Sequence, residues 1–200
     1  MISNRTLRKR REGFTIKDKI VVGVAGMPGS GKGVFRRTVQ RMGYPVVIMG
    51  DEVREEAKRR NLKPTPQNLG KTMLQLRESE GPAAIAKRCI PKLEKATERI
   101  VFIDGIRSLV EVEEFKKHFP KFVLIAIHAS PKTRYQRLFR RRRSDDPTNW
   151  ETFMERDLRE LGIGMGAVIS VADQVIVNEG TIFQFKQKIM QVMKKVLGNE

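Results

Sequence analysis

The sequence has almost no cysteine, no long hydrophobic run, and far fewer acidic than basic side chains. A single cysteine, Cys89, excludes an internal disulfide framework and a cysteine-rich zinc site. Apolar runs such as 21–24 and 46–49 have the length of strands, whereas a membrane-spanning helix needs roughly 18–20 residues. Glycine and proline occur at ordinary levels without a period, which excludes collagen-like, coiled-coil and low-complexity chains. No apolar signal segment follows the basic N-terminus, so we expect a reducing, cytoplasmic environment.

Strand-like and helix-like segments alternate along the chain, which at 200 residues and 40% apolar content suits one domain with a full core. Apolar, β-branched runs predict strands at 20–25, 46–49, 99–104, 122–128 and 174–177. Helical patterns predict helices at 32–42, 51–60, 65–80, 83–98, 109–119, from 131 onward, at 149–161 and at 182–196. Joined by right-handed crossovers, these elements predict an α/β fold, a five-stranded parallel sheet with helices on both faces. No linker divides residues 20–200.

The net charge is +17, and two segments carry most of it. Residues 1–19 have a net charge of +5 and no apolar periodicity, so we expect a basic, mobile arm. Residues 132–143 have a net charge of +7 and no acid. Focused positive charge favours an anionic partner, which is a phosphate-bearing ligand, a nucleic acid or an anionic lipid surface. Charge alone does not decide between them.

Eight residues between the first predicted strand and the next predicted helix form a glycine-rich loop. They are Gly26, Met27, Pro28, Gly29, Ser30, Gly31, Lys32 and Gly33. Glycines let successive backbone N–H groups point at a phosphate, and the N-terminus of the following helix adds its positive dipole. Lys32 adds a full charge for the β- and γ-phosphates. A glycine-rich turn with an exposed lysine is the alternative, but the strand-loop-helix context favours a phosphate-binding loop, or P-loop.

The residue after the lysine is Gly33, where a P-loop usually has the Ser or Thr hydroxyl that binds Mg²⁺. Magnesium must then be held by other groups. Asp104 ends a predicted buried strand, so it is our candidate for orienting Mg²⁺ and its waters. The alternative is that Asp104 caps the helix that begins near Leu109.

Three motifs resemble adenylate kinase. The loop at 26–33 is similar to that family's P-loop, which also has glycine after the lysine. The segment Gly50-Asp51-Glu52-Val53-Arg54 is similar to its Gly-Asp-x-x-Arg, whose arginine grips the acceptor phosphate. The segment Asp104-Gly105-Ile106-Arg107 resembles its Asp-Gly-Phe-Pro-Arg with one residue missing. The resemblance implies that Asp51, Arg54 and Arg107 bind the substrate and that residues 51–98 form acceptor-binding helices.

Two further segments look like dephospho-coenzyme-A kinase. They are Tyr44-Pro45-Val46-Val47 followed by Asp51, and residues 172–180. Together the resemblances cover about residues 20–197 and look closest to an archaeal group of adenylate-kinase-related P-loop proteins. This family implies a nucleoside-monophosphate-kinase-like P-loop NTPase fold, ATP with Mg²⁺, and a mobile lid.

The arginine-rich helix falls where nucleoside-monophosphate kinases carry their lid, which here would be a short one at about 132–160. Arg134, Arg137 and Arg141 lie three and four residues apart and so share a helix face, from which they could reach one anion together. We interpret Arg137 and Arg141 as catalytic, because the planar arginine fork can bind two phosphate oxygens. A solvated basic face is the alternative.

Departures from adenylate kinase leave the acceptor open. Val34 replaces a threonine, and no glutamine follows Arg107 where that family reads the AMP base. The residues that bind phosphates in adenylate kinase are thus retained, whereas the residue that recognises the AMP base is absent. The sequence predicts transfer of the γ-phosphoryl of ATP to a small, nucleotide-like acceptor; the alternative is an ATPase that acts on RNA or ribonucleoprotein through the basic arm and lid. A nucleotide-binding regulator with little catalysis is a third hypothesis, and the oligomeric state is open.

Overall fold

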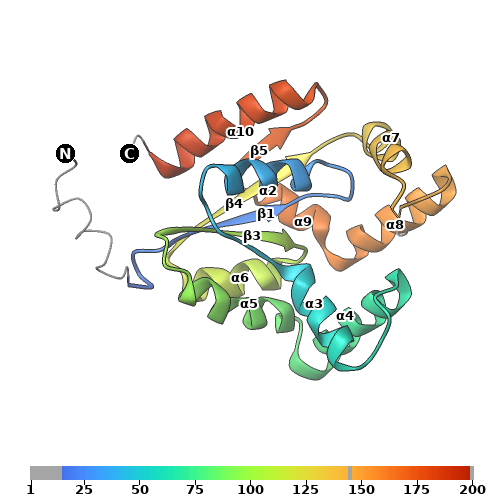
Figure 1. The fold of residues 1–200 in the computed structure, drawn as a ribbon, viewed down its shortest axis with the longest axis horizontal. Coiled ribbons are helices and arrows are strands. Elements are labelled where there is room, and N and C mark those ends of the chain that lie inside the picture. The colour runs from blue at the N-terminus through green and yellow to red at the C-terminus, as the bar shows by residue number, and fades with distance from the viewer. Residues whose placement is uncertain (1–14, 144–145, 199–200) are drawn as a thin grey trace.

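A five-stranded parallel sheet forms the centre of the molecule. The computed structural model describes residues 15–143 and 146–198 (Figure 1). The strands are β1 (Ile20–Ala25), β2 (Val46–Ile48), β3 (Ile100–Ile106), β4 (Lys121–His128) and β5 (Gln174–Val177). Their order is β2-β3-β1-β4-β5, and every neighbouring pair is parallel. The predicted α/β architecture is confirmed, with β1, which precedes the glycine-rich loop, in the middle.

Helices connect the strands as the sequence pattern predicts, with ends that differ by a few residues. They are α2 (Lys32–Arg41), α3 (Met49–Arg59), α4 (Pro66–Glu80), α5 (Ala84–Lys95), α6 (Leu109–His118), α7 (Pro131–Arg141), α8 (Trp150–Ile163), α9 (Met165–Ser170) and α10 (Ile182–Leu197). Helix α9 was not predicted, because six residues are too few for a helical period to show.

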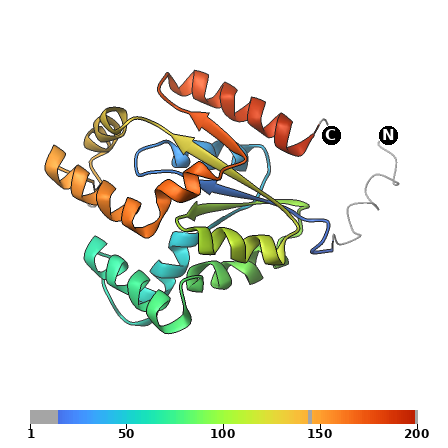
Figure 2. The same cartoon turned by 180° about the vertical axis from the view of Figure 1, so that it is seen from behind.

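Apolar side chains fill two layers, one on each face of the sheet. Helices α2 and α10 cover one face, where Phe35 and Phe185 pack on residues of β1, β3 and β4. Helices α5, α6 and α9 cover the other face, where Cys89 and Phe115 are fully buried. Figures 1 and 2 show these two layers from opposite sides. Cys89 is thus a small buried core residue, and burial raises the pKa of its thiol.

The predicted strand ending at Asp104 continues for two more residues. The register between β1 and β3 shifts after the pair Val24–Asp104, and Gly105 has a φ of 110°, which favours glycine. Asp104 therefore lies within the carboxyl end of a central strand. It does not cap α6, because the Ser108 side chain accepts from the backbone N–H of Glu111 at 3.3 Å. The capping alternative for Asp104 is wrong.

The predicted basic arm lies mostly outside the described residues, but its last residue is inside them. Lys19 is 2% exposed, and its ammonium donates to the backbone carbonyls of Leu93 (2.8 Å), Glu94 (2.7 Å) and Ala96. These carbonyls lie at the C-terminal end of α5, where a positive charge is favourable. Among the described helices, none is both long and apolar enough to cross a bilayer.

Candidate active site

The glycine-rich loop leaves β1 and enters α2 in a conformation that glycine makes possible. Gly31 stands at the N-terminus of α2 with a φ of 119°. A Cβ there would also collide with the Asn178 side chain and contact the Phe185 ring. Asn178 follows β5, and its Nδ2 donates to the backbone carbonyl of Ser30 at 2.8 Å. Asn178, which follows the edge strand β5, therefore holds the loop in place through the Ser30 carbonyl and leaves the N–H groups at the start of α2 available to a ligand.

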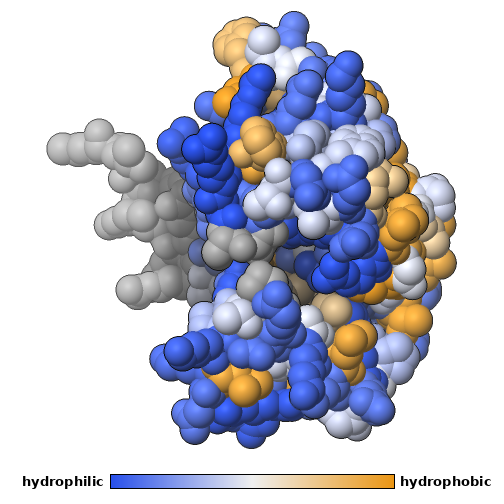
Figure 3. Space-filling view, turned by 90° about the vertical axis from the view of Figure 1, so that its right-hand side faces the viewer, coloured by the Kyte–Doolittle hydropathy of each residue, from blue (hydrophilic) through white to orange (hydrophobic). Residues whose placement is uncertain are grey.

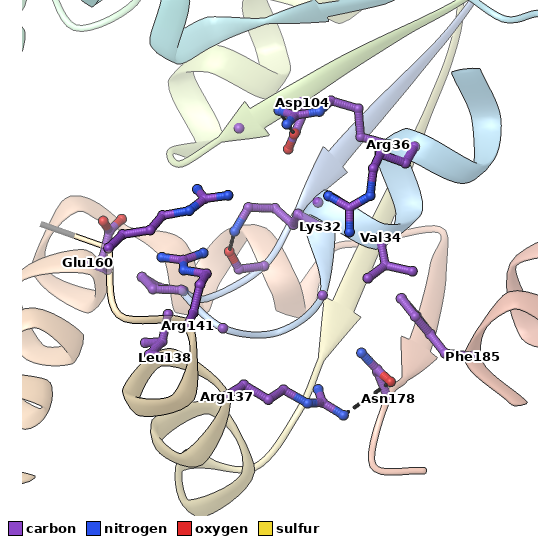
Figure 4. Close-up of a pocket in the computed structure, with 18 of the residues that line it drawn as sticks. Lys32, Val34, Arg36, Asp104, Arg137, Leu138, Arg141, Glu160, Asn178 and Phe185 are labelled. Atoms are coloured by element: carbon purple, nitrogen blue, oxygen red, sulfur yellow. Dashed lines mark hydrogen bonds and ion pairs between the residues drawn. The ribbon is translucent and has the colours of Figure 1, made fainter. Parts of the chain in front are cut away.

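Lys32 folds back over its own loop. Its Nζ donates to the carbonyls of Gly26 and, at 3.3 Å, Met27 (Figure 4). Burial lowers the pKa of Lys32 to about 8, and the nearby Asp104 carboxylate opposes this shift. Backbone carbonyls are weak partners for an ammonium, so a phosphate that enters the loop would compete for Lys32.

A pocket of about 510 Å³ opens beside the loop, and most of the charged residues that line it are cations. Its described lining includes Lys32 and eight arginines, against two acids, Asp104 and Glu160. The arginines are Arg36 and Arg37 from α2, Arg54 from α3, Arg107 after β3, Arg137, Arg141 and Arg143 from α7 and the segment after it, and Arg156 from α8. Such an excess of positive charge in one pocket suits a ligand with several negative charges.

Asp104 is the acid on the β3 side of this pocket. It is 6% exposed, and its Oδ1 has no hydrogen-bond partner among the described residues. Arg36 Nη1 lies 3.5 Å from the other oxygen, Oδ2. Burial raises the pKa of Asp104, while the charges of Lys32 and Arg36 act in the opposite direction.

The two carboxylates that line the pocket, Asp104 and Glu160, belong to no larger cluster of possible metal ligands among the described residues. Within residues 15–143 and 146–198, no group of three or more His, Cys, Asp or Glu side chains could hold a metal ion. Mg²⁺ bound to phosphates keeps most of its waters and needs one or two carboxylates. The unpaired Oδ1 of Asp104 on the pocket wall fits such a cation, one that arrives with a nucleotide.

Three residues were predicted to bind the substrate, and two of them lie at the pocket. Arg54 and Arg107 both line the pocket. Asp51 is not among its lining residues; it pairs with Arg54 at 2.9 Å and so orients that arginine. The backbone N–H of Arg107 donates to Glu111 at 2.8 Å, and its Nε lies 3.6 Å from Glu160.

Helices α7 and α8 span the segment predicted to be a lid, and two of the three predicted lid arginines line the pocket. Arg137 donates to Asn178 Oδ1 at 3.4 Å, while its Nη1 is buried without a partner among the described residues. Burial lowers the pKa of Arg137. Arg141 also lines the pocket and donates through Nε to Asp146 at 2.8 Å.

Arg134 does not join them, so the prediction of three arginines on one anion is wrong. Its side chain is 3% exposed and forms a two-pronged ion pair with Asp157 of α8, with Nη1 2.7 Å from Oδ1. It also donates to the carbonyls of Ala129 (3.0 Å) and Pro28 (3.3 Å). With its donors satisfied in this way, Arg134 holds α7 against α8 and against the P-loop.

Sequence reasoning missed Arg36, Glu160 and Asn178 as pocket residues. Arg36 belongs to no motif, and Glu160 looked like a partner for neighbouring arginines on its own helix. Asn178 had a usable signal, because it directly follows the last predicted strand. The carboxyl ends of parallel strands meet at one edge of the sheet, where ligands bind in open α/β folds.

Comparisons with known proteins agree with this architecture. A family model described as an AAA domain matches residues 25–154. The UPF0200 protein of Hyperthermus butylicus is 46% identical over 180 residues, which cover 90% of this chain and 96% of that protein. The UPF0200 protein PH1008 of Pyrococcus horikoshii is 46% identical over 184 residues, covering 90% and 99%.

Solved structures with much lower identity share the fold. A structure of TT1252 from Thermus thermophilus has a TM-score of 0.67 at 15% identity, covering 90% of this chain and 99% of that one. Shikimate kinase from Acinetobacter baumannii, in complex with shikimate, has a TM-score of 0.56 at 16% identity, covering 90% and 96%. A gluconokinase from Sinorhizobium meliloti has a TM-score of 0.54 at 14% identity, covering 90% and 94%. At these identities the likeness concerns the fold alone.

Proposed function

The chain belongs to the archaeal UPF0200 family and has a kinase-like P-loop fold, and from this premise we propose that it is an ATP-dependent phosphotransferase. The predicted membership of an archaeal P-loop kinase family is thereby confirmed. The proposal is finer: the γ-phosphoryl of ATP passes to a small, anionic acceptor.

One observation carries the proposal, which is that a single pocket collects cations from three separate parts of the fold. Lys32 comes from the P-loop, Arg54 and Arg107 come from the acceptor side, and Arg137 and Arg141 come from the lid. Phosphoryl transfer needs little more than two phosphate-bearing partners held in line and their oxygens neutralised. An ATP-binding regulator would not need Arg54 and Arg107 to hold an acceptor.

In the proposed reaction, an acceptor oxygen bonds to the γ-phosphorus while the bond to the β,γ-bridging oxygen breaks and ADP leaves. The loop N–H groups and Lys32 hold the β- and γ-phosphates. Arg137 and Arg141 neutralise the oxygens of the group in transfer, where one well-placed arginine is worth about 10³–10⁵ in rate. Arg54 and Arg107 hold the acceptor's anionic group. Mg²⁺ bound with ATP would supply further charge neutralisation, and Asp104 would hold it through its waters.

Transfer from labelled ATP·Mg²⁺ to a panel of acceptors tests the proposal. The panel contains nucleoside monophosphates, dephospho-coenzyme A, shikimate and gluconate, and Lys32→Ala is the control. We expect label in one anionic acceptor and none with the variant, whose lysine lines the pocket and belongs to neither apolar layer. Equal transfer by the Lys32→Ala variant, or no transfer to any acceptor, would refute the phosphotransferase function.

A second candidate is an ATPase that acts on RNA, and the charge of the lid favours it. Lys132, Arg140 and Arg142 are exposed, and the face where α4, α7 and α8 lie is covered mainly by hydrophilic residues (Figure 3). ATP hydrolysis that RNA stimulates, and that weakens steeply with salt, would support this candidate. The Lys32→Ala control applies here as well.

A further inference from the structure

The P-loop lacks the hydroxyl that normally binds Mg²⁺, yet its backbone has room for one. At Gly33 a Cβ would meet only Arg37 Nη1, at 3.6 Å, an ordinary van der Waals contact. Gly33 is also absent from the glycines with positive φ, so a side chain there would not be strained. Neither space nor backbone conformation therefore requires glycine at this position.

A cation of α2, Arg36, lies on the pocket wall beside the Asp104 carboxylate. Arg36 lies one helical turn after Gly33 in α2 and lines the same pocket. Figure 4 shows its guanidinium beside the Asp104 carboxylate, on the β3 side of Lys32. Lys32, Arg36 and Asp104 thus meet at the place where β- and γ-phosphates would enter.

The contact between Arg36 and Asp104 is loose. Nη1 and Oδ2 are 3.5 Å apart, which exceeds the length of a charge-assisted hydrogen bond. The Arg36 side chain is 30% exposed, and no other ion pair of Arg36 is found among the described residues. A guanidinium has five N–H donors in a fixed fork that matches phosphate oxygens. Arg36 can therefore bind a phosphate without losing a strong partner.

We propose that Arg36 binds the β- and γ-phosphate oxygens of ATP in the role that a P-loop Ser/Thr hydroxyl and its Mg²⁺ fill elsewhere, so that nucleotide binding depends only weakly on Mg²⁺. The inference rests on the proposed function, because it concerns the same nucleotide. It adds Arg36, which no motif identified, to the nucleotide site, and it adds a weak dependence on Mg²⁺, which the fold does not imply. Charged hydrogen bonds of this kind are each worth about 10- to 100-fold in affinity.

Equilibrium binding of ATP, measured by calorimetry in EDTA and again in excess Mg²⁺, tests the inference without relying on activity. The variants are Arg36→Gln, Arg41→Gln and Gly33→Ser. Arg41 is the matched control because it is an exposed arginine of the same helix outside the pocket lining. Gly33→Ser restores the hydroxyl without displacing any neighbour.

We expect chelation to weaken ATP binding by the unmodified protein less than about tenfold. In EDTA, Arg36→Gln should bind ATP about 10- to 100-fold more weakly, and excess Mg²⁺ should restore part of the loss. Arg41→Gln should match the unmodified protein in both conditions. Gly33→Ser should gain affinity only when Mg²⁺ is present.

Three results would count against the inference or its premise. Equal affinity of Arg36→Gln and Arg41→Gln in EDTA would show that Arg36 does not contact the nucleotide. A loss beyond about 100-fold when Mg²⁺ is removed from the unmodified protein would overturn weak metal dependence, whatever the variants do. Absence of ATP binding with and without Mg²⁺ would refute the proposed function itself.

Discussion

If the chain binds ATP as proposed, the lowered pKa of Lys32 should make that binding depend on pH in a range where a lysine normally stays protonated. An ordinary lysine has a pKa near 10.5, whereas burial lowers that of Lys32 to about 8 in the empty site. Only the protonated ammonium can bind the phosphates. Affinity should therefore fall as the pH rises through 8, because a growing fraction of the protein holds a neutral Lys32.

The size of the effect follows from the protonated fraction of Lys32. With a pKa of about 8, that fraction is about 0.9 at pH 7 and about 0.1 at pH 9. The apparent dissociation constant is the intrinsic one divided by this fraction, so it should rise about tenfold between the two pH values. A lysine with the usual pKa would stay protonated at both, and the affinity would not change measurably.

Calorimetric titration of ATP at half-unit steps from pH 7 to 9 measures this dependence. The matched control is Lys32→Arg, which keeps the charge and does not titrate in this range. It should bind with nearly constant affinity and so corrects for changes in the nucleotide or in other groups. A flat profile for the unmodified protein, or the same slope in both proteins, would refute the assignment of the titration to Lys32.

Three other changes separate the roles of the site and of the fold. Asp104→Asn should raise the Mg²⁺ concentration for half-maximal turnover about tenfold, and an unchanged metal titration would contradict its role in orienting Mg²⁺ waters. Arg54→Ala should raise the KM for the acceptor about 10- to 100-fold with little effect on ATP affinity, and the opposite pattern would reassign Arg54 to the nucleotide. Lys19→Met should lower stability by about 1–3 kcal/mol, because three carbonyls at the end of α5 lose a charged donor. Thermal unfolding measures this loss; an unchanged Tm would contradict it, and ATP binding should stay intact.

The strands and the parallel α/β architecture were within reach of the sequence because each signal is local. β-branched runs and glycine-rich turns mark the strands, and the right-handed crossover rule then leaves few topologies. Strand ends were less predictable, as at Asp104, because the continuation to Ile106 depends on a register shift against β1. Helix α9 was not predicted for a related reason. Its six residues are helical because they pack against α6, β1 and β4, and their own sequence shows no helical pattern.

The pocket residues divide in the same way. Lys32, Arg54 and Arg107 lie in motifs whose spacing is fixed by local backbone geometry, and all three line the pocket. Arg36 and Glu160 lie in no motif. Each reaches the pocket because its helix, α2 or α8, packs beside it in the fold. The periodicity of a sequence predicts the face of each helix, but it does not predict that two segments more than a hundred residues apart will line the same pocket.

Arg134 shows why a correct helix pattern can still misplace a function. The spacing of three and four residues puts Arg134, Arg137 and Arg141 on one side of α7, but the helix enters the site at an angle that the sequence does not encode. At its N-terminal end α7 packs against the loop, so Arg134 meets Pro28 and Asp157 and is buried with its donors satisfied. Farther along α7, Arg137 and Arg141 line the pocket. The same row of arginines therefore holds α7 to the loop and to α8 at one end and lines the pocket at the other, and the position of each along the helix decides which it does.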